Sequence, residues 1–290
     1  MDPSLLLIIL ICIIILFVCI AFSNNYLIVK KYTYESEKIP SEFNGVKIVH
    51  ISDLHSKRFG KNNGVLINKI EKLNPDYIFM TGDIIDKREN DIKKFIKELK
   101  PIFDKYVVYY SIGNHERALG YKKYVNYVKE LEKCGVHVLR DDSMYIDSHE
   151  KINIVGLNFK DNIRYEKNYA GIDRDLTYLR SKSGQVDLNK FNILLAHDPL
   201  NFELYHKLGF DLIFSGHVHG GLIRVFKIGL LSPRRKLFPK YCVGKYVKNE
   251  STMFVSTGLG RATIPIRLFN HPEISLIKLK MKKVDENIEE

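Results

Sequence analysis

The chain has 290 residues, with 45 lysines and arginines against 34 aspartates and glutamates, which gives a formal net charge of +11. With 45% hydrophobic and 27% charged residues, the composition excludes an intrinsically disordered or low-complexity chain, and the length suits one large domain with a full core. The four cysteines exclude a disulfide framework, because Cys12 and Cys19 lie in an apolar stretch while Cys134 and Cys242 are far apart.

The N-terminus begins with an apolar run, Leu5 to Phe22, that contains no charged residue. As a helix this run spans roughly 27 Å at 1.5 Å per residue, close to the hydrocarbon thickness of a bilayer. We therefore predict a single-pass membrane anchor over residues 1–25. A cleaved signal peptide is the alternative, since Ala21-Phe22-Ser23 has suitable small residues, but only Met1-Asp2-Pro3 precedes the run and it lacks a basic segment.

The charges that flank the apolar run bear on orientation. Lys30 and Lys31 follow it, so the positive-inside rule places the large domain in the cytoplasm, with an extracytoplasmic domain left open. Residues 26–45 read as a polar linker that ends in turn signals. A domain over 46–281 and a flexible tail over 282–290 complete the predicted organisation.

The first half of the domain alternates strands with helices. Each strand is a short apolar run, and each helix shows apolar residues spaced three or four apart. The predicted strands are Val46–Ile51, Tyr77–Thr81 and Tyr106–Ile112, and the predicted helices are Gly64–Leu73, Asp91–Leu99 and Tyr121–Cys134. Lys100-Pro101 is expected to end the second helix.

The second half is richer in strands. The predicted strands are Val136–Leu139, Met144–Asp147, Ile152–Leu157, Phe191–Ala196, Phe210–Phe214, Leu222–Phe226, Tyr246–Val247, Thr252–Thr257 and Ile274–Lys280. Helices are predicted at Asp173–Leu179 and Phe202–Leu208. The pattern indicates an α/β (α+β) fold, in which two mixed sheets pack together with helices outside. The loop from Gly229 to Tyr241, with Arg234, Arg235, Lys236 and Lys240, is predicted to be a solvated loop, a cap on the site or a membrane contact.

Polar residues of ligand type terminate the strands of both halves. They are Asp53, His55, Asp83, Asn114, His115, His197, His217 and His219. Carboxylate, imidazole and amide groups together suit borderline divalent metals such as Mn, Fe or Zn. The set is large enough for two ions, and such a pair, about 3.5 to 4 Å apart, can bridge a hydroxide that attacks a phosphoryl group.

Each of these residues also has a structural interpretation when taken alone. Asp53 could cap a helix, Asp83 could follow Gly82 in a turn, and a single His217 or His219 is more often structural than catalytic. Eight such coincidences at strand ends are improbable together, so the pattern favours a metal site.

The motifs in chain order resemble the calcineurin-like metallophosphoesterases. They are Asp53-x-His55, Gly82-Asp83-x-x-Asp86, Gly113-Asn114-His115-Glu116, His197 and Gly216-His217-x-His219. The resemblance covers roughly Val46 to Lys280 and implies a four-layer sandwich that holds two metal ions, with Mn favoured. It further implies that Asp53, His55 and His219 bind one ion, that Asn114, His197 and His217 bind the other, and that Asp83 bridges them.

The resemblance also implies roles for residues that do not bind metal. His115 would act on the leaving oxygen or on developing charge, and Asp86 and Glu116 would orient ligands. Separately, the guanidinium groups of Arg58 and Arg267 could pair with a substrate phosphate or be surface charges.

A narrower resemblance is to membrane-anchored bacterial phosphodiesterases and lipid A precursor pyrophosphatases. It rests on the N-terminal run, Gly220-Gly221, Pro265-Ile266-Arg267 and Pro272-Glu273-Ile274. It implies cleavage of phosphodiester, phosphomonoester or pyrophosphate bonds, with a lipid-linked substrate such as a UDP-diacylglucosamine-like precursor. Two alternatives stay open, a nuclease, prompted by the charge, and a catalytically silent phosphate-binding regulator. Nucleic acid is not the expected partner, because no nucleic-acid module is found.

Overall fold

A computed structural model describes residues 2–146, 148–159, 169–183, 186–225, 228–231, 237–261 and 266–282. Several predicted features lie outside these residues: Arg234, Arg235 and Lys236 of the basic loop, Pro265, and the tail from residue 283 onward.

The first sheet has six strands in the order β1-β14-β2-β3-β4-β5. Their bounds are Ile28–Ser36, Glu273–Met281, Lys47–Ile51, Tyr77–Thr81, Val107–Ser111 and His137–Leu139. Strands β2 to β5 are mutually parallel, β14 runs antiparallel to β2, and β1 runs parallel to β14. The carboxyl ends of β2, β3 and β4 therefore share one edge of the sheet.

The second sheet also has six strands, in the order β12-β13-β9-β8-β7-β6. Their bounds are Gly244–Lys248, Ser251–Val255, Leu212–Ser215, Phe191–Ala196, Ile152–Leu157 and Asp142–Tyr145. The four strands β13, β9, β8 and β7 are parallel, with an antiparallel strand at each edge. A small ribbon of β10 (Arg224–Val225) and β11 (Ile228–Gly229) follows β9 along the chain.

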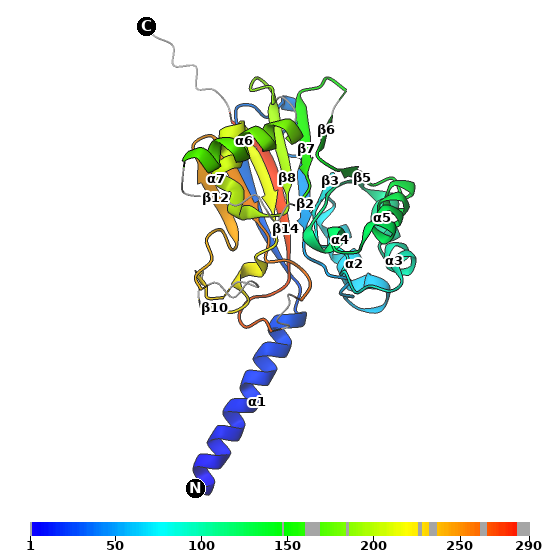
Figure 1. The fold of residues 1–290 in the computed structure, drawn as a ribbon. Coiled ribbons are helices and arrows are strands. Elements are labelled where there is room, and N and C mark those ends of the chain that lie inside the picture. The colour runs from blue at the N-terminus through cyan, green and yellow to red at the C-terminus, as the bar shows by residue number, and fades with distance from the viewer. Residues whose placement is uncertain are drawn as a thin grey trace.

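The two sheets pack face to face, with helices on both outer faces (Figure 1). The core between the sheets contains Phe79 and Ile193, while the neighbouring Met80 and Leu194 face the helices instead. This double burial explains why the central strands read as continuous apolar runs. The two-sheet fold predicted from the sequence is confirmed.

The helices divide between the two outer faces. On the first sheet lie α2 (Gly64–Leu73), α3 (Ile92–Lys105) and α5 (Tyr121–Lys133), with the short α4 (Asn114–Arg117) at the sheet edge. On the second sheet lie α6 (Tyr169–Ser183) and α7 (Phe202–Tyr205), and a 3-10 turn over His206–Leu208 continues α7.

Helix α1 (Pro3–Asn25) projects away from the sandwich (Figure 1). Its side chains from Leu5 to Val18 are apolar and mostly exposed. The helix is long and apolar enough to cross a membrane, and a signal sequence would pass the same test.

The prediction of a linker over residues 26–45 is wrong, because Ile28–Ser36 forms β1 and pairs with β14 along its full length. Tyr34, Ile39 and Phe43 from this segment lie in the core between the sheets. Lysines and glutamates on an edge strand hide this contribution in the sequence, since one face of such a strand meets water.

The prediction that Pro101 ends a helix is also wrong, because α3 continues to Lys105. Proline removes one backbone hydrogen bond, here to the carbonyl of Lys97. Both Lys97 and Pro101 are exposed, so water can satisfy that carbonyl. Burial of Ile102 and Phe103 on the opposite side of the helix stabilises its last turn.

Candidate metal centre

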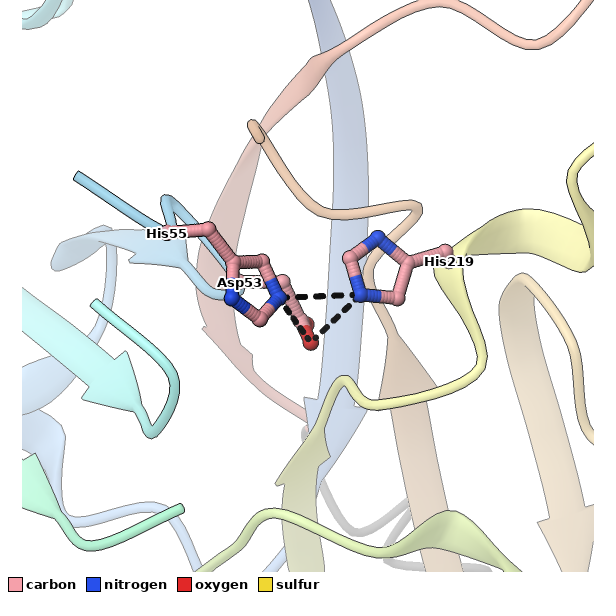
Figure 2. A group of neighbouring side chains, drawn as sticks. All are labelled: Asp53, His55 and His219. Atoms are coloured by element: carbon pink, nitrogen blue, oxygen red, sulfur yellow. Dashed lines mark hydrogen bonds and ion pairs between the residues drawn. The ribbon is translucent and has the colours of Figure 1, made fainter. Parts of the chain in front are cut away.

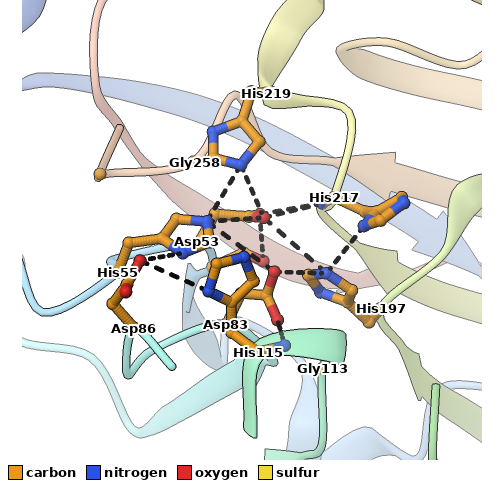
Figure 3. Close-up of polar contacts among 12 residues, drawn as sticks. Asp53, His55, Asp83, Asp86, Gly113, His115, His197, His217, His219 and Gly258 are labelled. Atoms are coloured by element: carbon orange, nitrogen blue, oxygen red, sulfur yellow. Dashed lines mark hydrogen bonds and ion pairs between the residues drawn. The ribbon is translucent and has the colours of Figure 1, made fainter. Parts of the chain in front are cut away.

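The ligand-type residues of both sheets meet at one edge of the sandwich (Figure 3). From the first sheet, Asp53 and His55 follow β2, Asp83 follows β3, and Asn114 and His115 open α4 after β4. From the second sheet, His197 follows β8, and His217 and His219 follow β9. Parallel strands place their carboxyl ends together, which brings these distant segments to the same point.

One group of donors joins Asp53, His55 and His219 (Figure 2). The Nε2 atoms of His55 and His219 are 3.1 Å apart. The Oδ1 atom of Asp53 lies 3.2 Å from His219 Nε2 and 3.9 Å from His55 Nε2. The three ligand atoms thus converge on one small volume.

A second group joins Asp83, His197 and His217. His197 Nε2 lies 3.3 Å from Asp83 Oδ2 and 3.1 Å from His217 Nδ1. Asp83 Oδ2 is also 3.8 Å from His55 Nε2 of the first group. The Asp83 carboxylate therefore lies between the two groups.

A third group lies beside the first and consists of His55, Asp86 and His115. The Oδ2 atom of Asp86 is 3.4 Å from His115 Nδ1 and 3.9 Å from His55 Nδ1. Arg88 holds the other carboxylate oxygen through its Nε, at 2.8 Å. The Asp86 carboxylate thus lies between the Nδ1 atoms of the His115 and His55 rings.

The donors present fit divalent cations. The amide oxygen of Asn114 is buried and accepts no hydrogen bond, which is costly unless another positive partner reaches it. Two pairs of imidazole nitrogens face each other at 3.1 Å beside ionised carboxylates. Nitrogen and oxygen donors in this proportion suit Mn, Fe or Zn and give no preference among them.

The surroundings prepare the donors for ligation. Burial lowers the pKa of His55 to about 3 and that of His217 to about 4, which keeps both rings neutral. Burial would also lower the pKa of His197, but the charges of Asp83 and Asp53 outweigh it and raise the value to about 10. The two carboxylates thus attract positive charge, which is the property that a cation site requires.

Burial by itself would raise the pKa of Asp53 and Asp83, yet the pKa of each carboxyl lies below its usual value. Histidines outweigh burial in both cases, chiefly His219 at Asp53 and His197 at Asp83. Both carboxylates are therefore ionised at neutral pH, the form that binds metal.

The backbone adopts the left-handed conformation at most of the donors. Asp53, His55, Asp83, His217 and His219 have φ values of 51°, 48°, 52°, 68° and 51°. Such values are uncommon outside glycine, and in folded proteins they concentrate at functional sites. The strain indicates that the fold places these side chains at the expense of backbone preference.

Glycine is required where two neighbouring segments come close to the carboxylates. A Cβ atom on Gly216 would lie 2.2 Å from Asp53 Oδ2 and 2.0 Å from Ser52 Oγ. A Cβ atom on Gly113 would lie 2.3 Å from Asp83 Oδ1. Both glycines of the predicted motifs therefore allow close approach to the carboxylates.

Glu116 lies under the loop that carries Asp83 rather than among the donors. Its carboxylate accepts hydrogen bonds from the backbone N–H groups of Asp83, Ile84, Ile85 and Gly113 and from the Tyr110 hydroxyl. Burial and the charge of Asp83 raise its pKa to about 7. Glu116 thus ties the loop after β3 to the loop after β4.

The two predicted phosphate-pairing arginines are engaged elsewhere. Arg267 is buried, and its guanidinium donates to the carbonyls of Thr257, Gly258 and Gly260. Its Nη2 is 3.3 Å from His219 Nδ1. The main chain occupies its donors and the ring of His219 lies beside it, so the contact with substrate phosphate stays a prediction without support in this geometry.

Arg58 is also paired within the protein. Its Nε donates to Glu98 at 2.7 Å, and its Nη1 lies 3.4 Å from a carboxylate oxygen of Glu89. Two carboxylates therefore offset its charge. The contact with substrate phosphate predicted for Arg58 has no support in this geometry.

Sequence reasoning missed several residues that shape the site. The Ser52 hydroxyl donates either to Asp53 Oδ2 or to the Thr81 carbonyl, and the Asn270 amide donates to the His219 carbonyl. The Phe159 ring packs against His217 and His197 at 5.0 and 5.7 Å between centroids. Ser52 is adjacent to a predicted ligand, whereas no local pattern identifies Phe159 or Asn270.

An open pocket of about 340 Å³ lies on the side of Arg117, which follows the donors Asn114 and His115 in α4. It is lined by Arg117, Tyr121, Tyr124 and Asn158. Arg117 donates to the Phe159 carbonyl, and the Phe159 ring packs on two of the histidines. One residue therefore separates the cavity from the donors.

Comparison with known proteins was consistent with this arrangement. A family model described as calcineurin-like phosphoesterase matches residues 46–221. An uncharacterized metallophosphoesterase of Campylobacter jejuni is 32% identical over 92% of this chain and 68% of its own length. Another from Aquifex aeolicus is 30% identical over 89% of this chain and 93% of its own length. A zebrafish transmembrane protein with a metallophosphoesterase domain is 26% identical, over 84% of this chain and 55% of that protein.

Proposed function

The chain belongs to the calcineurin-like phosphoesterase family and is a metal-dependent phosphoric ester hydrolase, and from this premise we propose that it works with a dinuclear centre. The observation that carries the proposal is the position of the Asp83 carboxylate, 3.3 Å from His197 and 3.8 Å from His55. A carboxylate so placed can bridge two ions.

We assign the remaining ligands from the same geometry. Asp53, His55 and His219 would hold the first ion, and Asn114, His197 and His217 would hold the second. The neutral rings and ionised carboxylates described above support this division, as does the unpartnered oxygen of Asn114. Two bound divalent ions would activate water and polarise the phosphoryl oxygens.

The other residues act on the substrate or on the ligands. Asp86 Oδ2 lies 3.4 Å from His115 Nδ1, which accepts a hydrogen bond from the Lys87 backbone N–H, and we assign His115 Nε2 to the leaving oxygen, to which it would deliver a proton. The Thr81 carbonyl lies 2.6 Å from His197 Nδ1 and fixes the ring with Nε2 toward Asp83. Phe159 covers His217 and His197 and excludes water from that side.

The proposal is tested by stripping the full-length protein in detergent with a chelator and then adding Mn, Fe or Zn singly. We expect hydrolysis of a generic aryl phosphodiester to disappear and to return with metal, in proportion to two ions bound per chain. Binding of a single ion at full activity would contradict the dinuclear centre, and activity in the stripped protein would contradict the metal-dependent mechanism.

The role of His115 has its own test. His115→Gln should slow esters with poor leaving groups by about 100-fold or more, because a general acid supplies roughly that factor. Esters with good leaving groups should be affected much less, since they need no proton. An equal loss for both classes, or weaker metal binding, would assign His115 to a structural or ligand role instead.

The substrate and location form a further part of the proposal. We take α1 as a membrane anchor and place the domain on the cytoplasmic side, on the basis of Lys30 and Lys31. A membrane-associated phosphate or pyrophosphate, such as a UDP-diacylglucosamine-like lipid, is then the natural substrate class. Mn as the native metal and the likeness to lipid A precursor pyrophosphatases remain predictions. Labelling of cysteines introduced at exposed domain positions in intact cells tests the orientation, since an extracytoplasmic domain would react with an impermeant reagent.

A further inference from the structure

Helix α1 leaves the domain at the same edge as the metal centre. Strand β1 starts at Ile28, which is paired with Glu273 at the start of β14. Further along β14, Ser275 is paired with His50 near the carboxyl end of β2, and that end leads directly into Asp53. The register therefore places the end of α1 beside the donors and not at the far end of the sandwich (Figure 1).

The end of α1 is fixed to this edge by several contacts. The Ser23 hydroxyl accepts a hydrogen bond from the Phe269 backbone N–H at 3.1 Å. Lys57 and Lys69 donate to the carbonyls of Asn24 and Leu27, where positive charge suits the end of a helix. The anchor thus cannot swing freely relative to the site.

Aromatic rings add to this attachment. Phe22 and Tyr26 stack at 4.7 Å, and both meet the His271 ring edge to face, at 5.4 and 5.8 Å. His271 and Phe269 flank Asn270, whose amide holds the His219 carbonyl. The segment that receives the anchor is therefore the segment that supports a predicted metal ligand.

A group of exposed apolar side chains lies on the segment that receives α1 and on segments bonded to it, and we call this group the apolar collar. It consists of Ile228, Leu237, Phe238, Ile266 and Phe269, which are 57%, 70%, 66%, 42% and 62% exposed.

Backbone bonds join the segments that carry the collar, although these segments are distant in sequence. Ile223 is bridged to Leu268, next to Phe269, and Leu231 is bridged to Leu237. The Phe238 N–H donates to the Leu230 carbonyl at 3.0 Å. The residues from Leu222 onward follow directly after the loop of His219, so these bonds tie the collar segments to the metal edge.

We propose that the apolar collar inserts into the interfacial layer of the bilayer that α1 crosses, so that the metal centre faces the lipid headgroups. Large exposed apolar side chains on a soluble surface mark contact surfaces, and these lie around the exit of an apolar helix. The basic net charge favours an anionic membrane surface. The inference rests on the anchor assigned in the proposed function and does not depend on hydrolysis.

This placement narrows the class of substrate. A phosphate group carried by a membrane lipid lies at the level of the metal centre, whereas a phosphate on a large soluble partner must pass between the domain and the bilayer. The same collar could instead cover a second copy of the chain, and the experiment below separates the two occupants.

The chain contains no tryptophan, so a single introduced tryptophan reports its own surroundings. Phe238→Trp and Phe269→Trp place the probe in the collar of the full-length protein. Phe17→Trp is the control inside α1. Val247→Trp is the matched control on an exposed apolar position, because Val247 is paired with Thr252 near the opposite end of the second sheet.

Each variant is reconstituted in phosphatidylcholine and phosphatidylglycerol vesicles, with and without brominated lipid. We expect blue-shifted, quenched emission from positions 238, 269 and 17, and solvent-like, unquenched emission from 247. Unquenched emission at 238 and 269 with quenching at 17 would overturn the inference. Blue-shifted but unquenched emission that disappears on dilution would also overturn it, in favour of a second copy. Absence of quenching at position 17 would show that α1 does not lie in the bilayer, and the inference would fall with the anchor on which it rests.

A functional readout completes the test. Phe238→Glu should lower hydrolysis of a vesicle-borne phosphodiester by at least about 5-fold and leave a soluble aryl phosphodiester unchanged. Val247→Glu should change neither rate. Equal losses on both substrates would contradict a membrane role for the collar, while inactivity of the unmodified protein on both would count against the proposed hydrolase and not against the collar.

Discussion

The two sheets contribute different chemistry to the same edge. The first provides the three carboxylates Asp53, Asp83 and Asp86, as well as the Asn114 amide, while three of the histidines, His197, His217 and His219, come from the second. The first and second donor groups each draw on both sheets, because the first needs His219 and the second combines Asp83 with His197 and His217, whereas the third group comes from the first sheet alone. The metal centre therefore lies where the two sheets meet, and it depends on their packing against each other.

The two halves also differ in their support. Glu116 ties together the loops of the first sheet through four backbone N–H groups. The loop of the second sheet is held mainly from outside itself, by Asp53 and by the segment of Arg267 and Asn270. We infer that the acidic half is the rigid part of the site and that the histidine half depends on its neighbours.

The largest effect should come from removing the carboxylate that lies between the halves. Asp83→Asn keeps the volume but removes the charge shared by His55 and His197. We expect activity to fall by more than about 100-fold, beyond the loss typical of an outer hydrogen-bonding partner. Asp142→Asn, at an exposed position on β6, is the control and should retain full activity. Equal activity of the two variants in a steady-state assay would exclude Asp83 as a bridging ligand.

Metal removal should lower the stability of the protein where the two sheets meet. A ligand that binds only the folded state at 100 times its dissociation constant stabilises a protein by about 2.7 kcal/mol. Chelation should therefore lower the melting temperature by several degrees, measured by differential scanning fluorimetry. In His217→Ala the shift should be smaller, because the second ion loses a ligand. An identical shift in both proteins would mean that His217 does not hold metal.

A smaller effect should come from the support under the first sheet. Glu116→Gln loses part of a network of buried acceptors, and we expect about 2 kcal/mol lower stability in urea unfolding. Tyr110→Phe removes a single donor to the same carboxylate and should cost about 1 kcal/mol. If Glu116→Gln unfolds at the same urea concentration as the unmodified chain, the rigid half does not depend on this residue.

The smallest effect concerns the cavity beside the site. Arg117→Ala should raise KM about 10-fold for substrates with a bulky organic group, and it should leave kcat nearly unchanged. A 10-fold change corresponds to a loss of roughly 1.4 kcal/mol of binding free energy. Tyr121, also in the cavity wall and 85% exposed, gives a milder comparison as Tyr121→Ala. A drop in kcat without a change in KM would place Arg117 in support of α4 and His115 instead.

Parts of the fold were accessible from the sequence because buried parallel strands leave unbroken apolar runs. The runs at Tyr77–Thr81, Ile152–Leu157 and Phe191–Ala196 coincide with β3, β7 and β8 residue for residue. The edge strand β1 was missed, because its lysines and glutamates resemble a linker when its partner β14, more than 200 residues later, is unknown. The helix end predicted at Pro101 was wrong for a similar reason. Whether water can reach the Lys97 carbonyl depends on the tertiary structure and cannot be read from the sequence.

The sequence by itself determined the fold class and the set of ligand-type residues at the strand ends, because both follow from local pattern and from motif order. Only the tertiary structure decided which donors share a group, because β2 and β9 are brought together by sheet packing and not by spacing. It also decided that Arg267 serves the main chain, that Glu116 serves the loops, and that helix α1 leaves from the metal edge. These depend on contacts between segments far apart in the chain, which no local pattern encodes.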